Sequence, residues 1–405
     1  MNFVRTLANV PRVLDRFFQV HVPTRIVYGP GLIDDFAAEW ELLGVRRAFC
    51  IADAGVAQAG LLDRVRAGLQ RAGAECVGVF TQVPPNSTLR AVEACAVEAK
   101  GTGAEALVAV GGGSVIDTAK CAGLLVAHGG DLVADYAGAQ TVPGPILPVV
   151  AVPTTAGTGS EVSQAAMVAD PDTRRKLSFV DHHLRPRLAI LDPSLTIGLP
   201  PLLTATTGMD AVTHAIEAFT GIEHAPFADA AATEALRLIA AALPAAARNG
   251  ADMAARGAML VAATLAGVAF DHSMVGVVHA MAHAVGALAD VHHGAANAIL
   301  LPYGMRYNHT ACRDRYAELA VRLGLARGPR RGAGALGAWV ASLRRELHER
   351  TGLPLTLREA GVREDQLPDI AALAEEDGAS FYNPRPVEAK RVLPLLHAAW
   401  RGAEE

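Results

Sequence analysis

Residues 106–120 read ALVAVGGGSVIDTAK, and this stretch decides the fold. A run of apolar residues at 106–110 is followed by three glycines and then by residues with helical spacing, which predicts a strand, a tight turn and a helix. Glycines let a phosphate approach backbone N–H groups, and the N-terminus of a helix favours negative charge. The turn at Gly112, Gly113 and Ser114 therefore predicts a nucleotide site, although it lacks the G-x-G-x-x-G fingerprint of many dinucleotide folds.

The same alternation of strand and helix extends through the first half of the chain, which predicts a parallel sheet covered by helices on both faces. From about Pro200 onward the sequence favours helix almost throughout, and Pro200-Pro201 is a good boundary because two prolines cannot lie inside a helix. We expect an α/β dinucleotide-binding domain over residues 1–199 and an all-helical domain over residues 200–405. The other expected strands are 25–28, 48–52, 76–80 and 147–152, and the expected helices are about 61–73, 88–100 and 114–127.

The composition narrows the class of protein. The chain has 405 residues, of which 51% are hydrophobic and 19% charged, so we expect a packed globular protein with two domains. The net charge of −5 argues against a nucleic-acid partner. No uninterrupted apolar run approaches the roughly 18–20 residues of a membrane helix, and charged residues interrupt the N-terminus where a signal peptide would be apolar. Five cysteines without a CxxC pair predict buried free thiols and a reducing cytoplasm.

A second motif predicts a metal site in the helical half. Asp210 and His214 are four residues apart on an expected helix, so both point from one face. His279 and His283 repeat that spacing, and His293 follows His279 by 14 residues, about 21 Å along a straight helix. The chain must therefore turn between them, with Gly286 and Gly294 as the candidate turn points.

The density of histidines in this segment is unusual. Fourteen histidines in 405 residues predict about half a histidine in a window of 15, yet residues 279–293 hold four. One carboxylate and three imidazoles suit a single divalent ion, iron or zinc. The composition does not choose between His279 and His283, nor between His292 and His293.

Two further features point to a dinucleotide. The loop 153–160, PTTAGTGS, follows the fifth apolar run, and the hydroxyls of Thr154, Thr155 and Thr158 can hold a pyrophosphate or the nicotinamide side. Asp53 ends the second expected strand, where a carboxylate accepts hydrogen bonds from a ribose and repels a 2′-phosphate, which favours NAD over NADP. Asp53 is also placed to cap the following helix, and both interpretations stay open.

With these motifs in place, the chain resembles the iron-containing (group III) alcohol dehydrogenase family over roughly residues 22–400. The resemblance implies a dinucleotide-binding domain and a helical domain with the site in the cleft between them. It implies that Asp210, His214, His279 and His293 are the metal ligands, and that His283 faces substrate and nicotinamide. The motifs that carry it are GGGS with Asp117 and Lys120, PTTAGT at 153–158, GMDAVTHAIE at 208–217, HAMAH at 279–283, HG at 293–294, NAILLP at 297–302 and NPR at 383–385.

The resemblance also implies a substrate pocket and a cofactor site. Phe270 falls where the family has an apolar wall of the pocket. Ala284, Asp271-His272 and His292 depart from the family pattern, and because they lie by the pocket they bear on the substrate more than on the metal or cofactor. The residues at or near family cofactor positions are Asp53, Asn86, Gly113, Ser114, Asp117, Thr154, Thr155, Thr158 and Lys176.

We therefore expect a cytoplasmic, metal-dependent, NAD(H)-linked alcohol dehydrogenase or aldehyde reductase, using Fe²⁺ (iron) or alternatively Zn²⁺ (zinc). Its expected partners are a small alcohol or aldehyde and further copies of itself, in a homodimer or larger homo-oligomer. The alternatives are a hydroxyacid–oxoacid transhydrogenase, a dehydroquinate-synthase-like lyase and a catalytically idle nucleotide-binding protein. The lyase would need several basic residues for an anionic substrate, and residues 200–300 hold only Arg237, Arg248 and Arg256. The complete ligand set argues against the idle protein.

Overall fold

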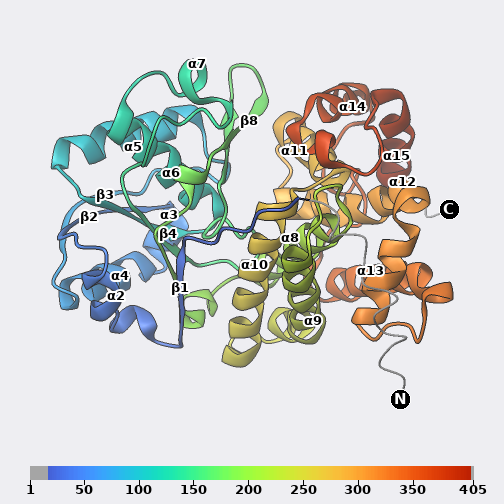
Figure 1. The fold of residues 1–405 in the computed structure, drawn as a ribbon, viewed down its shortest axis with the longest axis horizontal. Coiled ribbons are helices and arrows are strands. Elements are labelled where there is room, and N and C mark those ends of the chain that lie inside the picture. Colours follow the sequence, from blue (N-terminus) through green and yellow to red (C-terminus); the bar gives the residue numbers. More distant parts are fainter. Residues whose placement is uncertain (1–16, 403–405) are drawn as a thin grey trace.

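The computed structural model describes residues 17–402 as two parts that lie side by side (Figure 1). The first is built on a six-stranded sheet in which every pairing is parallel, with the strand order β1-β9-β6-β4-β2-β3. The expected α/β part with a parallel sheet, followed by a helical part, is confirmed. The strands of this sheet are β1 Arg25–Tyr28, β2 Arg47–Ala52, β3 Glu75–Phe80, β4 Ala106–Gly111, β6 Val149–Pro153 and β9 Leu188–Leu191.

Helices cover both faces of this sheet, which explains why its central strands are apolar without alternation. Val108 and Val110 of β4 pack on the side of α4, whereas Leu107 and Ala109 pack on the side of α5 and α6. The three helices expected between the strands are confirmed to within two residues at each end. The helices of this part are α2 Ala37–Glu41, α3 Ala54–Gln58, α4 Leu61–Arg71, α5 Leu89–Thr102, α6 Gly113–His128 and α7 Leu132–Tyr136.

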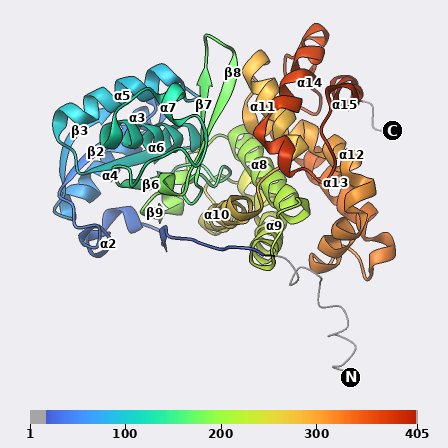
Figure 2. The ribbon, with the colours of Figure 1, turned by 45° about the horizontal axis from the view of Figure 1, so that its top comes forward.

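A second, smaller sheet was not expected from the sequence. It has the order β5-β8-β7, from β5 Gly138–Ala139, β7 Ala165–Asp170 and β8 Arg175–Val180. β7 and β8 form an antiparallel hairpin. Figure 2 shows this hairpin rising between the α/β part and α11, so β8 contributes to the boundary between the two parts.

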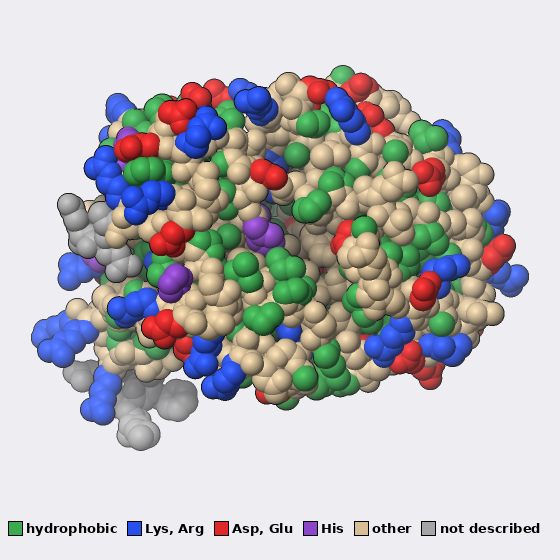
Figure 3. Space-filling model, turned by 180° about the vertical axis from the view of Figure 1, so that it is seen from behind, with side chains coloured by type: hydrophobic (Ala, Val, Ile, Leu, Met, Phe, Trp, Pro, Cys, Tyr) green, Lys and Arg blue, Asp and Glu red, His purple; other side chains and the backbone are tan. Residues whose placement is uncertain are grey.

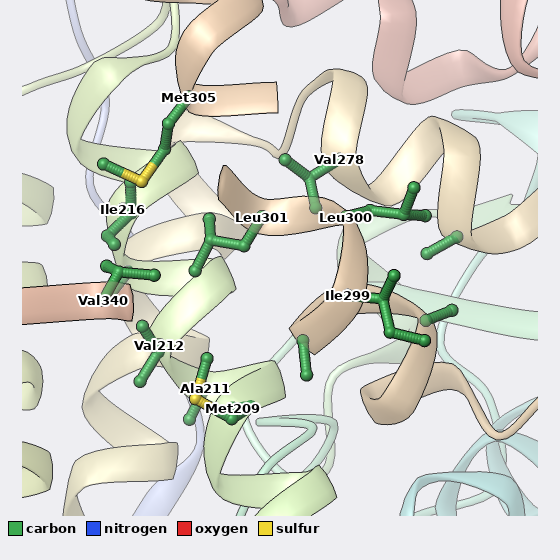
Figure 4. Packing of buried hydrophobic residues seen from close by; sticks show 14 of the residues in the cluster. Met209, Ala211, Val212, Ile216, Val278, Ile299, Leu300, Leu301, Met305 and Val340 are labelled. Atoms are coloured by element: carbon green, nitrogen blue, oxygen red, sulfur yellow. The ribbon is translucent and has the colours of Figure 1, made fainter. Parts of the chain in front are cut away.

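The helical part is built around α8, in which every residue from Thr204 to Thr220 is buried. α9, α10 and α12 surround it, and small side chains let these helices approach closely. Figure 4 shows apolar side chains of α8, α11, α12 and α13 interleaved in this core. The helices are α8 Pro201–Thr220, α9 Pro226–Arg248, α10 Met253–Ser273, α11 Val277–Ala289, α12 His293–Arg322, α13 Gly332–Thr351, α14 Leu367–Glu376 and α15 Ala389–Arg401. Short 3-10 helices are η2 Leu32–Asp34, η3 His182–Leu184, η4 Pro193–Thr196, η5 Pro329–Arg331, η6 Glu364–Gln366 and η7 Gly378–Tyr382.

Two of these helices, α9 and α10, are long and apolar enough to cross a membrane by length and composition alone. Both belong to the helical core, where they pack extensively against each other and against α8. Their apolar character is therefore explained by burial within the protein.

The turn between α11 and α12 exists as expected, but the expected turn residues are wrong. The chain turns at residues 290–292, where Asp290 adopts a left-handed φ of 52°. Gly286 lies inside α11, and Gly294 is the second residue of α12. Gly294 serves helix packing, because a Cβ there would lie 2.3 Å from the carbonyl oxygen of Thr206 on α8.

Candidate metal centre and dinucleotide cleft

Three helices bring three of the expected metal ligands together. Asp210 on α8, His279 on α11 and His293 on α12 have side-chain exposures of 3%, 2% and 22%. Asp210 Oδ1 lies 3.8 Å from His279 Nε2 and 3.5 Å from His293 Nε2. A tetrahedral ion with bonds of about 2.1 Å holds its ligand atoms about 3.4 Å apart. The spacing of these three side chains therefore fits one divalent ion.

The side-chain amide of Asn297 shows that these ligand atoms converge on one point. Its Nδ2 donates to Asp210 Oδ1 at 2.6 Å and lies 3.2 Å from Nε2 of both His279 and His293. An amide nitrogen has two hydrogens and can donate to only two of these atoms at once, but its position shows that all three atoms lie within 3.2 Å of one point. No local pattern singles out Asn297, because its contacts come from three helices.

His214, the fourth expected ligand, lies one helical turn after Asp210. Its ring stacks between two others, with ring centres 4.5 Å from His279 and 4.4 Å from Phe270. Burial lowers the pKa of His214 to about 4, so the ring is neutral at pH 7, which is the form that binds a metal. Within residues 17–402 its buried Nδ1 has no hydrogen-bond partner. A neutral, buried imidazole whose Nδ1 has no partner supports a fourth ligand, although among the described residues the ligand atoms that lie within 4.8 Å of one another are those of Asp210, His279 and His293.

Glu217 orients His279 from behind. Its Oε2 lies 2.6 Å from His279 Nδ1, and the two carboxylate oxygens also accept from the backbone N–H groups of Gly276 and Val278 at 3.0 and 2.8 Å. A carboxylate can only accept at this distance, so Nδ1 carries a proton, and Nε2 is the ring nitrogen that faces Asp210. Burial opposes a charged ring, but the bonds to Asp210 and Glu217 outweigh it and raise the pKa of His279 to about 9. Metal binding must therefore displace a proton from this ring.

His283 lies beside these residues and is held by a different carboxylate. Its ring stacks on His293 with centres 5.2 Å apart, and its Nδ1 lies 2.9 Å from Oδ2 of Asp377. Burial raises the pKa of Asp377, but the neighbouring His283 and the other contacts outweigh this and lower it overall. The carboxyl of Asp377 is therefore ionised. The carboxylate keeps the proton on Nδ1 and leaves Nε2 available for chemistry. Asp377 is 94 residues away in the chain, so sequence spacing could not reveal it.

The two polar loops expected to bind a dinucleotide lie side by side. β4 and β6 are neighbours, and their register pairs Gly111 with Pro153, so the turn that begins with Gly112 and the loop that begins with Thr154 leave the sheet together. Gly112 is the residue before α6, whose first N–H groups face this edge. The arrangement places Gly113 and Ser114 next to the loop with Thr154, Thr155 and Thr158.

Buried polar bonds fix the second loop to α6. The Nζ of Lys120 donates to Ser160 Oγ at 2.9 Å, to the Ser163 carbonyl at 2.9 Å and to the Ala165 carbonyl at 2.7 Å. Asp117 accepts from Ser160 Oγ at 2.6 Å and from the Met167 N–H at 3.0 Å. Both oxygens of Asp117 thus hold protein groups in place.

The same loop also contacts the helical part. Gly159 has a φ of +63°, and a Cβ on it would lie 2.5 Å from the Cα of Gly267 on α10. Thr264, one turn earlier on α10, donates to Oε1 of the buried Glu161 at 2.7 Å. The segment 153–163 is therefore bonded to both parts of the molecule.

The remaining cofactor candidates lie at two places. Asp53 Oδ1 accepts from the Val56 N–H at 2.8 Å, so it caps α3 as one of the two interpretations required. Asn86 and Lys176 line a cleft of about 600 Å³ that also reaches Gly286 and His293. Burial lowers the pKa of Lys176, although its side chain stays partly exposed in the cleft. Figure 3 views the molecule from behind and shows a hollow near the middle of that face, with a histidine side chain beside it.

Comparisons with known proteins show which family the chain belongs to. The model described as iron-containing alcohol dehydrogenase matches residues 23–193, and the model for the C-terminal part of the Fe-containing alcohol dehydrogenase family matches residues 204–400. The chain belongs to the iron-containing alcohol dehydrogenase family.

Several members of the family cover nearly the whole chain. The 1,3-propanediol dehydrogenase of Klebsiella pneumoniae is 38% identical, over 95% of this chain and 99% of that protein. The NAD-dependent methanol dehydrogenase of Bacillus methanolicus is 35% identical, over 93% of this chain and 98% of that protein. A solved 1,3-propanediol oxidoreductase superposes with a TM-score of 0.90 at 37% identity, over 95% of this chain and 100% of that one.

The structure corrects the expected place of one departure from the family pattern. Asp271 does not face the pocket but is buried, with Oδ2 2.8 Å from Arg185 Nε and Oδ1 accepting from the Gln164 N–H at 2.6 Å. His272 Nε2 accepts from the His21 N–H at 3.0 Å. The reason is helical geometry: Phe270 contacts His214, and the two residues after it point to other sides of α10. In this family member the Asp271-His272 pair joins segments of the fold.

We expect Glu217→Gln to weaken metal binding by about 10- to 100-fold, because an amide nitrogen would repel the Nδ1 proton and disturb the tautomer of His279. The measurement is the dissociation constant for Zn²⁺ by competition with a chromogenic chelator. Glu223→Gln, the same change at an exposed position, is the matched control. An unchanged affinity in a folded Glu217→Gln protein would show that the orientation of His279 does not depend on this carboxylate.

Proposed function

We propose that this chain is a metal-dependent, NAD(H)-linked dehydrogenase of small alcohols, which also reduces the corresponding aldehydes. The observation that carries the proposal is the convergence of Asp210 Oδ1, His279 Nε2 and His293 Nε2 on one point. The donor set suits Fe²⁺ or Zn²⁺, and membership of the iron-containing family supports Fe²⁺, with Zn²⁺ as the alternative.

In this proposal Asp210, His214, His279 and His293 hold the ion. When bound, the metal supplies Lewis-acid activation of the substrate oxygen, and the nicotinamide exchanges a hydride with the substrate carbon. Phe270 fixes the ring of His214 by stacking and adds an apolar surface beside it. An apolar wall excludes water from the reacting groups.

His283 is the proposed proton relay. Its Nε2 takes the hydroxyl proton in alcohol oxidation and returns it in aldehyde reduction. Asp377 holds Nδ1 at 2.9 Å and stabilises the imidazolium that forms when Nε2 is protonated. The support for this role is that His283 is adjacent to His293 and His279 while its Nδ1 is bonded elsewhere.

The proposed cofactor is NAD rather than NADP. The pyrophosphate would lie on the N–H groups at the start of α6, where the helix dipole favours negative charge. Asp53 would accept a ribose hydroxyl with the oxygen that does not cap α3, and it would repel a 2′-phosphate. The proposed cofactor residues are Asp53, Asn86, Gly112, Gly113, Ser114, Asp117, Thr154, Thr155, Thr158 and Lys176.

We further propose a dinucleotide-binding domain over residues 1–199 and a metal- and substrate-binding domain over residues 200–405. The family relatives act on small alcohols by name, which supports a small alcohol or aldehyde as the substrate. A cytoplasmic homodimer or larger homo-oligomer is the proposed state. Among the described residues β1 pairs with β9 alone, and this open edge supports association with another copy.

The test is anaerobic reconstitution of the metal-stripped protein with Fe(II), with Zn(II) or with no metal. NADH formation is then followed against a panel of primary alcohols and diols. We expect NADH only in the samples that contain metal. An absence of turnover with either metal, in protein that still binds NADH, would contradict the dehydrogenase. Oxoacid acceptors would then test the transhydrogenase.

A further inference from the structure

Two thiols meet in the α/β part, on the strands β2 and β3. The Sγ atoms of Cys50 and Cys76 are 3.7 Å apart. Cys76 pairs with Ala48, and Ala48 and Cys50 point to the same face of β2 because strand side chains alternate, so the two thiols lie on one face of the sheet. Both thiols belong to the hydrophobic cluster on the α4 face of the sheet. This pair takes no part in the metal centre or in the proposed function.

The two thiols differ in their surroundings. Cys50 is fully buried, whereas Cys76 is partly exposed and lines a surface cavity of about 540 Å³. The charged residues that line this cavity are Asp63 and Arg66 from α4 and Glu75 from β3. Arg66 lines the same cavity as Cys76 and forms an ion pair with Asp63 at 3.2 Å. A cation beside a partly exposed thiol is the setting of reactive cysteines.

These contacts favour a thiolate at Cys76. The contact with Cys50 and the nearby Arg66 outweigh burial and lower the pKa of Cys76 to about 6. The same contact and burial raise the pKa of Cys50 well above its usual range. Ionisation of Cys76 is therefore favoured over ionisation of Cys50. Burial raises the pKa of each of the other three cysteines, Cys95, Cys121 and Cys312.

We propose that Cys76 and Cys50 form a hydroperoxide-reactive dithiol, in which Cys76 is the attacking thiolate and Cys50 the resolving thiol. The Cys76 sulfur attacks the terminal oxygen of the hydroperoxide, and the O–O bond breaks. Water or an alcohol leaves after protonation, and Cys76 is oxidised to a sulfenic acid. The Cys50 sulfur then loses its proton and attacks the Cys76 sulfur, the S–O bond breaks, and a second water leaves. The product is a disulfide, which requires the sulfurs to close from 3.7 Å to about 2.05 Å.

The first experiment uses the full-length protein loaded with zinc, so that iron does not react with the oxidant. One equivalent of hydrogen peroxide is added at pH 7, free thiols are alkylated, and peptides are read by mass spectrometry. We expect a peptide that links Cys50 to Cys76, and unmodified Cys95, Cys121 and Cys312. Wild-type protein with no such link and no sulfenic acid at Cys76 overturns the proposal.

Variants separate the two roles. Cys50→Ala should stop at the sulfenic acid, which dimedone traps at Cys76, whereas Cys76→Ser should leave Cys50 unoxidised. The rate of Cys76 alkylation against pH should have its midpoint near pH 6 in the wild type. Arg66→Gln should move that midpoint upward, and Arg66→Lys should restore much of the shift. Equal oxidation of Cys50 in the Cys76→Ser protein, or a midpoint of a free thiol in the wild type, contradicts the assignment.

Discussion

His279→Ala should leave the protein without a tightly bound divalent metal. The change removes one of three donors that converge on a point, and it leaves the buried carboxylate of Glu217 without its ring partner. Loss of an outer partner of a metal ligand weakens binding by about 10- to 100-fold, and loss of the ligand itself should exceed this. The measurement is the metal-to-protein ratio after reconstitution with zinc and dialysis.

The matched control is His283→Ala, the same substitution one helical turn away. This protein should keep its metal, because His283 is bonded to Asp377 and is not one of the converging donors. Its kcat should nevertheless fall by about 10²- to 10⁴-fold, the usual contribution of a positioned acid or base. A His279→Ala protein with full metal content and full activity would contradict the assignment of His279 as a metal ligand.

Asp271→Ala should lower the free energy of unfolding by about 3–5 kcal/mol, because it leaves a buried guanidinium without a counter-charge. The Arg185 and Asp271 side chains are only 6% and 2% exposed, and their atoms lie 2.8 Å apart. The Gln164 N–H would lose its acceptor as well. The effect is measured by urea denaturation and by the shift in Tm, with separate probes in the α/β and helical parts.

Two controls identify the cause of this loss. Arg185→Met combined with Asp271→Leu removes both charges and should be less destabilising than Asp271→Ala alone. Glu234→Ala breaks the exposed pair with Arg237 and should change stability by less than about 1 kcal/mol. An Asp271→Ala protein as stable as the Glu234→Ala protein would show that the buried pair contributes nothing net.

The fold could be predicted where a strand is buried on both faces, because its sequence is then an unbroken apolar run. β4 and β6 are buried on both faces, so their sequences are unbroken apolar runs, and the glycines after β4 mark the start of α6. β9, a run of four buried apolar residues, was missed. The hairpin of β7 and β8 was missed because β7 is rich in alanine, which is common in helices, and β8 begins with two charged residues.

Only those site residues could be predicted whose spacing along one helix puts them on the same face. Pairs four residues apart, such as Asp210 with His214, share a face by geometry alone, and the crowding of histidines indicated a common target. Glu217, Asn297 and Asp377 could not be assigned roles in this way. Each acts through contacts from other helices, and only packing determines which helices meet.

The contacts of the segment 153–163 limit how this chain can be recombined with a relative. The boundary near Pro200 is a clean cut in the chain, but in space the segment is bonded to α6 through Lys120 and is pressed against α10 at Gly159 and Gly267. A chimera spliced at residue 200 would set one parent's segment against the other parent's α10. Neither glycine has room for a methyl group. Both positions must therefore be taken from the same parent, although 108 residues of chain separate them.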